Sequence, residues 1–189
     1  MRQIKDLGIK SKEGLKVKNL KRFPSMEFGE EGGLQAELWL ENHTYLGTLY
    51  QEGNGGCADF SWNSNLTSET REQIKEKVHS FLLRNDKDYG PNSKYSWLKN
   101  KTAENVDDDD IEMLVICFEE AYDAKKFAEK QFKKGYKTVA RLNRGYCFNW
   151  LSYRCDNVTI EEINKYILDN SINCGSIDLF THTQDLAMI

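Results

Sequence analysis

Residues 34–40 carry the pattern that most constrains how this chain folds. Small or branched apolar residues alternate there with larger or more polar ones: Leu34, Ala36, Leu38 and Leu40 against Gln35, Glu37 and Trp39. An alternation of period two places one set of side chains on each face of a β-strand. The segment therefore predicts a strand in a sheet that has one buried face.

Neighbouring segments extend this strand into an antiparallel meander over residues 15–62. Further strands are predicted over residues 15–18, 45–50 and 58–62, with turns at residues 41–43 and 53–56. The second turn, Gly53-Asn54-Gly55-Gly56, resembles a phosphate-binding loop in its glycine content. It lacks the lysine and the following helix that such a loop needs, so we interpret it as a hairpin turn.

The remainder of the chain predicts helices and a second β-region. Helices are expected over residues 67–83, 107–134 and 159–168, the last opened by a Thr159/Glu162 capping box. A hairpin is expected over residues 136–153, a long loop over residues 85–105 and a short strand over residues 176–180.

These elements define an α+β fold class: an N-terminal antiparallel β-meander followed by helices and a C-terminal β-hairpin. The length of 189 residues suits one domain, which we expect to combine a β-rich half (1–66) with a helix–hairpin–helix half (67–189).

The location of the protein is predicted from three absences. No apolar stretch reaches the length of a membrane span, and the first residues lack the apolar core of a secretory signal. The five cysteines are odd in number and widely spaced, which argues against a disulfide framework and against a zinc site. We expect a cytoplasmic protein that contacts no membrane and binds no metal or cofactor; the sequence does not indicate its oligomeric state.

Charge is distributed along the chain in blocks. Residues 1–22 carry a net charge of +6, residues 23–120 of −12, residues 121–155 of +7 and residues 156–189 of −5. After folding, such blocks either form separate basic and acidic surfaces or interleave and neutralise each other, and the sequence does not distinguish the two. Separate surfaces would favour cationic partners on one side and phosphate groups on the other.

The acidic candidates for a protein-binding surface are six carboxylates: Asp107, Asp108, Asp109, Asp110, Glu119 and Glu120. The four aspartates also suit the first turn of a helix, where negative charge is stabilised by the helix dipole. Their spacing does not match a calcium-binding loop.

The basic and aromatic candidates for a nucleic-acid-binding surface follow later in the chain. They are Lys126, Lys130, Lys133, Lys134, Arg141, Arg144, Tyr146, Phe148 and Trp150. The lysines share one helical face and suit phosphate contacts, or else they form an ordinary solvated helix end. The aromatic residues alternate as in RNA-recognition strands, where rings stack on bases; such alternation is also typical of a strand that faces a protein core.

Catalytic motifs are absent from the sequence. His43, His79 and His182 are far apart, and the chain contains no G-x-S-x-G, H-E-x-x-H or C-x-x-C motif. We therefore expect a non-enzymatic protein and assign no catalytic residue, with an unrecognised nuclease or modifying enzyme as the alternative.

The glycine-rich part of the meander resembles a class of small accessory proteins. The residues concerned are Phe28-Gly29-Glu30-Glu31-Gly32-Gly33-Leu34, Gly47-Thr48-Leu49-Tyr50 and Gly53-Asn54-Gly55-Gly56. Over residues 17–62 the chain is similar to proteins carried by phages and other mobile elements of bacteria, among which anti-CRISPR proteins that inhibit Cas9 occur. The resemblance implies no particular site residue.

This resemblance and the charge blocks together lead to a functional expectation. We expect an interaction protein of a phage or mobile element that inhibits a host nucleic-acid-guided defence nuclease, such as Cas9, by charge-complementary binding. The partners would be that host defence protein and, through the basic segments, DNA or guide RNA. The alternative is a nucleic-acid-binding module that uses the lysine and arginine stripe and the strand aromatics.

Overall fold

A computed structural model describes most of the chain: residues 1–24, 32–53, 56–86, 88–91, 93–143, 148–172, 174 and 176–187, with backbone alone at Asn143 and Phe148. Its internal contacts divide the chain into two compact units. The first unit comprises Met1–Tyr122 together with Ala187–Ile189, and the second comprises Asp123–Leu186. The α+β fold class predicted from the sequence is confirmed.

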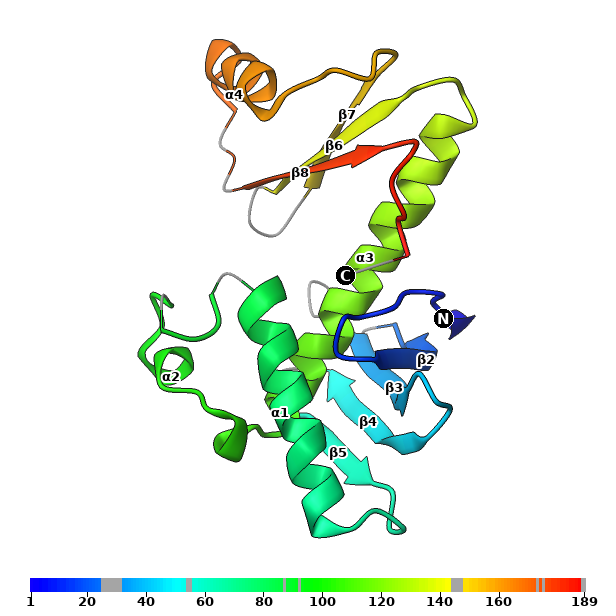
Figure 1. Cartoon of the computed structure of the whole chain (residues 1–189), viewed down its shortest axis with the longest axis vertical. Helices are drawn as coiled ribbons and strands as arrows, with labels where there is room; N and C mark the ends of the chain where they lie inside the picture. Colours follow the sequence, from blue (N-terminus) through cyan, green and yellow to red (C-terminus); the bar gives the residue numbers. More distant parts are fainter. Residues whose placement is uncertain are drawn as a thin grey trace. The chain divides into compact units, whose positions relative to one another are not determined.

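The first unit contains the predicted antiparallel meander (Figure 1). Its strands are β1 (Arg2–Asp6), β2 (Leu15–Arg22), β3 (Gly32–Leu40), β4 (Tyr45–Gly53) and β5 (Asp59–Trp62), and they are hydrogen-bonded in the order β1-β2-β3-β4-β5. Strand β1 was not predicted because Ile4 is its one buried residue, and a single apolar side chain produces no period.

One face of this sheet is the core of the unit. Leu34, Ala36 and Leu38 of β3 are buried there, as the alternation predicts. In β2 the buried residues Val17 and Leu20 are three apart rather than two. A register shift between Lys18 and Lys21 explains this spacing, because a β-bulge inserts one extra residue and returns the next side chain to the same face.

Two helices, α1 (Ser68–Asn85) and α3 (Asp108–Phe132), cover the buried face (Figure 1). The side chain of Thr67 caps α1 by accepting a hydrogen bond from the Thr70 N–H. The rings of Phe81 in α1 and Phe118 in α3 stack with centroids 5.2 Å apart and planes 14° from parallel. The connection between these helices, predicted as a long loop, also contains a short helix, α2 (Ser96–Lys99), and a 3-10 turn at Ala103–Asn105.

The second unit is built on a three-stranded sheet with the order β7-β6-β8. Its elements are β6 (Thr138–Asn143), β7 (Phe148–Tyr153), α4 (Ile160–Asp169) and β8 (Ser176–Thr181). The predicted capping box opens α4: the Thr159 hydroxyl accepts from the Glu162 N–H, and the Glu162 carboxylate accepts from the Thr159 N–H. Ala140 and Leu142 of β6 pack with Ile163 and Ile167 of α4, so one face of this sheet is buried under the helix.

Candidate nucleic-acid interface

The face of the first sheet opposite the helices is directed toward solvent. Trp39 and Glu37 of β3 alternate with the buried leucines and lie on this side. The strand register places Lys16 and Tyr45 opposite Trp39, so a lysine and a second aromatic residue flank the indole ring. Antiparallel sheets commonly have one buried and one solvated face, and here the solvated face carries aromatic rings as well as charges.

We refer to this surface as the open sheet face and define it by its outward residues on β2, β3 and β4: Lys16, Lys18, Lys21, Gln35, Glu37, Trp39, Tyr45, Thr48, Tyr50 and Glu52. The Trp39 and Tyr45 rings have centroids 5.2 Å apart and are tilted by 57°. The ammonium group of Lys18 lies 4.6 Å from the Trp39 centroid, which is within the range of a cation–π interaction. Tyr50 is 45% exposed.

Hydrogen bonds hold the Trp39 ring in place. Its Nε1–H donates to Glu37 Oε2 at 3.0 Å, and Asn19 Nδ2 donates to the same oxygen at 2.9 Å. Tyr45 is similarly joined to the Thr48 hydroxyl. The polar edge of the indole is thus occupied inside the protein, and the half-buried ring is flanked by Lys18 and Tyr45.

Lysines make the β2 side of the open sheet face basic, whereas Glu52 on β4 and Asp59 on β5, which is opposite Tyr50, make its other side acidic. Lys16, Lys18 and Lys21 lie along β2, and among the described residues none of them forms an ion pair. The carboxylate of Glu37 accepts hydrogen bonds from Trp39 and Asn19. Aromatic rings that stack on bases, beside lysines that contact phosphates, are the combination that proteins use to bind single-stranded nucleic acids.

The predicted acidic residues lie on α3 and just before it, and most of them have partners within the protein. Asp107 and Asp110 each accept a hydrogen bond from the other's backbone N–H, and Lys101 bridges them at 2.6 and 2.8 Å. Asp108 accepts from the Phe60 N–H, whereas Asp109 is exposed. The run therefore forms the first turn of a helix, the alternative that its position in the sequence allowed.

Glu119 and Glu120 are in the middle of α3. Glu119 is buried and forms ion pairs with Arg2 at 3.3 Å and with Arg22 at 2.7 Å. Glu120 is half-buried. The basic block at residues 1–22 and the acidic block that follows it thus meet inside the first unit and neutralise each other at Glu119.

A buried polar cluster surrounds Asp110. This side chain is almost fully buried, and its Oδ1 atom has no hydrogen-bond partner in the described part of the chain. Burial raises the pKa of Asp110, whereas the hydrogen bond from Lys101 holds the pKa of Asp107 below its ordinary value despite partial burial. The Tyr89 hydroxyl lies 3.2 Å from His79 Nδ1, and burial together with the Asp110 charge raises the pKa of Tyr89.

His79 in this cluster predicts a pH dependence of stability. Burial lowers the pKa of His79 more than the Asp110 carboxylate raises it. As the pH falls, the imidazole is therefore protonated earlier in the unfolded chain than in the folded protein. The free energy of unfolding should therefore decrease as the pH falls from about 7.5 to about 5.5. In the variant His79→Gln, which keeps a polar group beside Tyr89, this decrease should be smaller.

Urea denaturation of both proteins across that pH range provides the measurement. The difference between them isolates His79 from His43 and His182, which are present in both. Parallel loss of stability in the two proteins would show that His79 is protonated equally well in the folded and unfolded states.

The predicted basic residues lie in the second unit. Lys126, Lys130, Lys133 and Lys134 are exposed on α3 and just after it, and Lys126 is 3.7 Å from Glu129. Arg141 on β6 is paired with Asp178 on β8 at 2.8 Å. The helix ends as predicted, with Gly135 in the left-handed conformation after the last lysines.

In the predicted aromatic strand, the Trp150 ring is packed against another ring of the protein. Trp150 on β7 stacks on Phe127 of α3, with centroids 4.2 Å apart and planes 23° from parallel. This contact agrees with the alternative that the ring faces the protein core. Arg144 and Tyr146 lie outside the described residues, as does the side chain of Phe148.

Sequence reasoning did not single out the open sheet face. The signal that could have found it is Trp39. In the alternation over residues 34–40, this aromatic residue is on the same side as the polar residues Gln35 and Glu37. Lys16, Lys18 and Tyr45 join it only through strand pairing, which residue order does not display.

Two structural features are absent from the described residues. No group of three or more histidine, cysteine, aspartate or glutamate side chains is arranged to hold a metal ion. No helix within the described ranges combines the length and apolar character needed to cross a membrane.

Comparison with known proteins provides no relative from which a function could be transferred. No protein-family model matches the chain, and no curated protein or solved structure matches it either.

Proposed function

We propose that this protein binds single-stranded nucleic acid on the open sheet face. The observation that carries the proposal is the group formed by Lys18, Trp39 and Tyr45, in which a cation and two rings lie together on a solvated β-sheet. The rings would stack on bases, and the lysines of β2 would contact phosphates.

The arrangement favours a single strand over a duplex. Bases of a duplex are stacked on each other, so their faces are closed to a protein ring, whereas those of a single strand are open. The open sheet face carries its rings on regular strands rather than on a helix that could enter a major groove. Recognition would depend little on base sequence, because every base has a π-face.

Replacing Trp39 tests the stacking component. Binding of a fluorescein-labelled oligothymidylate of about 15 nucleotides, followed by fluorescence anisotropy, should be about 5- to 150-fold weaker for Trp39→Ala, the loss of one stacked base. The matched control is Trp97→Ala, which removes a tryptophan that is 61% exposed elsewhere in the same unit. Equal effects of the two variants, or no binding by the unaltered protein at low salt, would contradict the proposal.

Lys18 should contribute through phosphate contact. The logarithm of the affinity falls linearly with the logarithm of the salt concentration. For Lys18→Ala this slope should be less steep by about 0.7, the value for one phosphate contact to a single strand. Lys133→Ala, an exposed lysine just after α3, serves as the control of equal charge change. Identical slopes for both variants would show that the lysines of β2 act only through net charge.

Inhibition of a nucleic-acid-guided nuclease such as Cas9 stays a prediction that rests on the resemblance and on the charge blocks. A charge-complementary contact through Asp107, Asp110 or Glu119 would have to compete with their present ion pairs. A cleavage assay separates the two functions: a protein that only binds single strands slows cleavage when it is in excess over DNA, whereas an inhibitor acts at the concentration of the nuclease.

A further inference from the structure

Strand β8, at the edge of the second sheet, has backbone N–H and C=O groups that are directed away from its neighbour β6. Strand β8 is paired with β6 on one side, and it is the outermost described strand on the other. The His182 N–H donates to the Lys137 carbonyl, so these two residues form a hydrogen-bonded pair of the antiparallel ladder. Hydrogen-bonded and non-hydrogen-bonded pairs then alternate along β8. Phe180 and Asp178 then direct their backbone groups toward β6, and Ile177 and Leu179 direct theirs outward.

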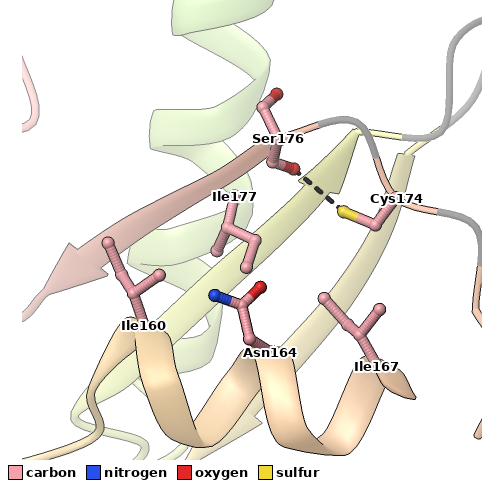
Figure 2. Close-up of a pocket in the computed structure, with 6 residues that line it drawn as sticks. All are labelled: Ile160, Asn164, Ile167, Cys174, Ser176 and Ile177. Atoms are coloured by element: carbon pink, nitrogen blue, oxygen red, sulfur yellow. Dashed lines mark hydrogen bonds between the residues drawn. The ribbon is translucent and has the colours of Figure 1, made fainter.

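A pocket lies beside this edge, between α4 and the start of β8 (Figure 2). It has a volume of about 230 Å³ and is lined by Ile160, Asn164, Ile167, Cys174, Ser176 and Ile177. Figure 2 shows the three α4 side chains directed toward β8, with the Asn164 amide between two isoleucines. The volume is below the roughly 300–1,000 Å³ of pockets that enclose whole small-molecule ligands, and it suits a single apolar side chain.

The charge around the pocket selects the kind of partner. Helix α4 carries Glu161, Glu162 and Asp169 against the single Lys165, a net charge of −2. Glu161 directly follows Ile160 of the pocket lining. A strand with cationic side chains would be attracted to this helix, whereas a second copy of this chain docked through the same edge would bring its own α4 carboxylates with it. Complementary charge therefore favours a basic partner over self-association.

We propose that the outer edge of β8 and the α4 pocket bind an extended basic peptide of another protein, which adds to the sheet as a fourth strand. Its backbone would bond to Ile177 and Leu179, one apolar side chain would enter the pocket, and flanking lysines or arginines would face the α4 carboxylates. This mode of recognition takes affinity from main-chain hydrogen bonds and specificity from the pocket. The site is independent of the open sheet face.

A synthetic peptide with alternating lysine and valine, about ten residues long and labelled with fluorescein, tests the proposal by anisotropy with the full chain. It should bind saturably and about tenfold or more tightly than the same peptide with glutamate in place of lysine. The variant Ile160→Lys, which places a charged side chain in the pocket wall, should weaken binding about tenfold or more.

Leu168→Lys is the matched control, because it adds the same charge to the same helix at a residue that is 77% exposed and does not line the pocket. Circular dichroism confirms that both variants are folded. In the unaltered protein, hydrogen exchange at the Leu179 amide should slow when the peptide binds, while exchange at Phe180 should not change.

Three results would overturn the proposal. They are equal binding of the acidic and basic peptides, equal effects of Ile160→Lys and Leu168→Lys, and a concentration-dependent dimer that Ile160→Lys abolishes. The last result would identify a second copy of this chain as the occupant of the edge.

Discussion

Replacing Phe118 with alanine is expected to lower the free energy of unfolding by about 3–5 kcal/mol, the largest single effect that we predict. Phe118 is completely buried in α3, and its ring stacks on that of Phe81, which is completely buried in α1. Truncation removes the apolar contacts of a whole ring and leaves a cavity between two helices that the sheet holds in place. Partial collapse of the surroundings would place the loss toward the lower end of the range.

Urea denaturation followed by circular dichroism measures this effect. Trp97→Ala removes an aromatic side chain of similar size from an exposed position and should change the stability by no more than about 0.5 kcal/mol. In a double-mutant cycle, Phe81→Ala should cost less when Phe118 is already alanine, because the stacked pair has then been broken. Additive losses would show that the two rings contribute independently.

Replacing Glu119 with glutamine is expected to have the second largest effect, about 2 kcal/mol of lost stability. The substitution keeps the shape of a buried side chain but removes the charge that faces Arg2 and Arg22. Breaking a fully buried pair costs about 3–5 kcal/mol. The expected loss is smaller here because the two arginine side chains are 40% and 29% exposed and can turn toward water.

Glu129→Gln is the control for Glu119→Gln. It removes one charge from the exposed pair of Lys126 and Glu129 on the same helix, and a loss of at most about 0.5 kcal/mol is expected. Similar losses for the two variants would mean that the contacts of Glu119 with β1 and β2 contribute no more than a surface ion pair.

The fold could be predicted from the sequence where structure depends on neighbouring residues. The alternation over residues 34–40, the stripe of α1 and the capping box at Thr159 each predicted an element that the structure contains. Strand β1 escaped prediction because its pairing with β2, rather than its own apolar content, makes it a strand.

The candidate site could not be predicted because it depends on partners far apart in the chain. Lys16, Trp39 and Tyr45 come from three strands, and the ion pair of Arg22 with Glu119 joins residues 97 positions apart. The net charges of sequence blocks therefore do not predict the charge of the folded surface, because opposite charges from different blocks pair with each other, as Arg22 does with the buried Glu119.

The sequential strand order of the first sheet also has a consequence for how the chain acquires its structure. Each strand from β1 to β5 pairs with the one before it, so the sheet can grow one hairpin at a time as the polypeptide leaves the ribosome. Such local pairing closes short loops, which favours rapid folding. The second sheet must instead wait until α4 has been synthesised before β8 can join β6, and this non-local closure should be its slowest step.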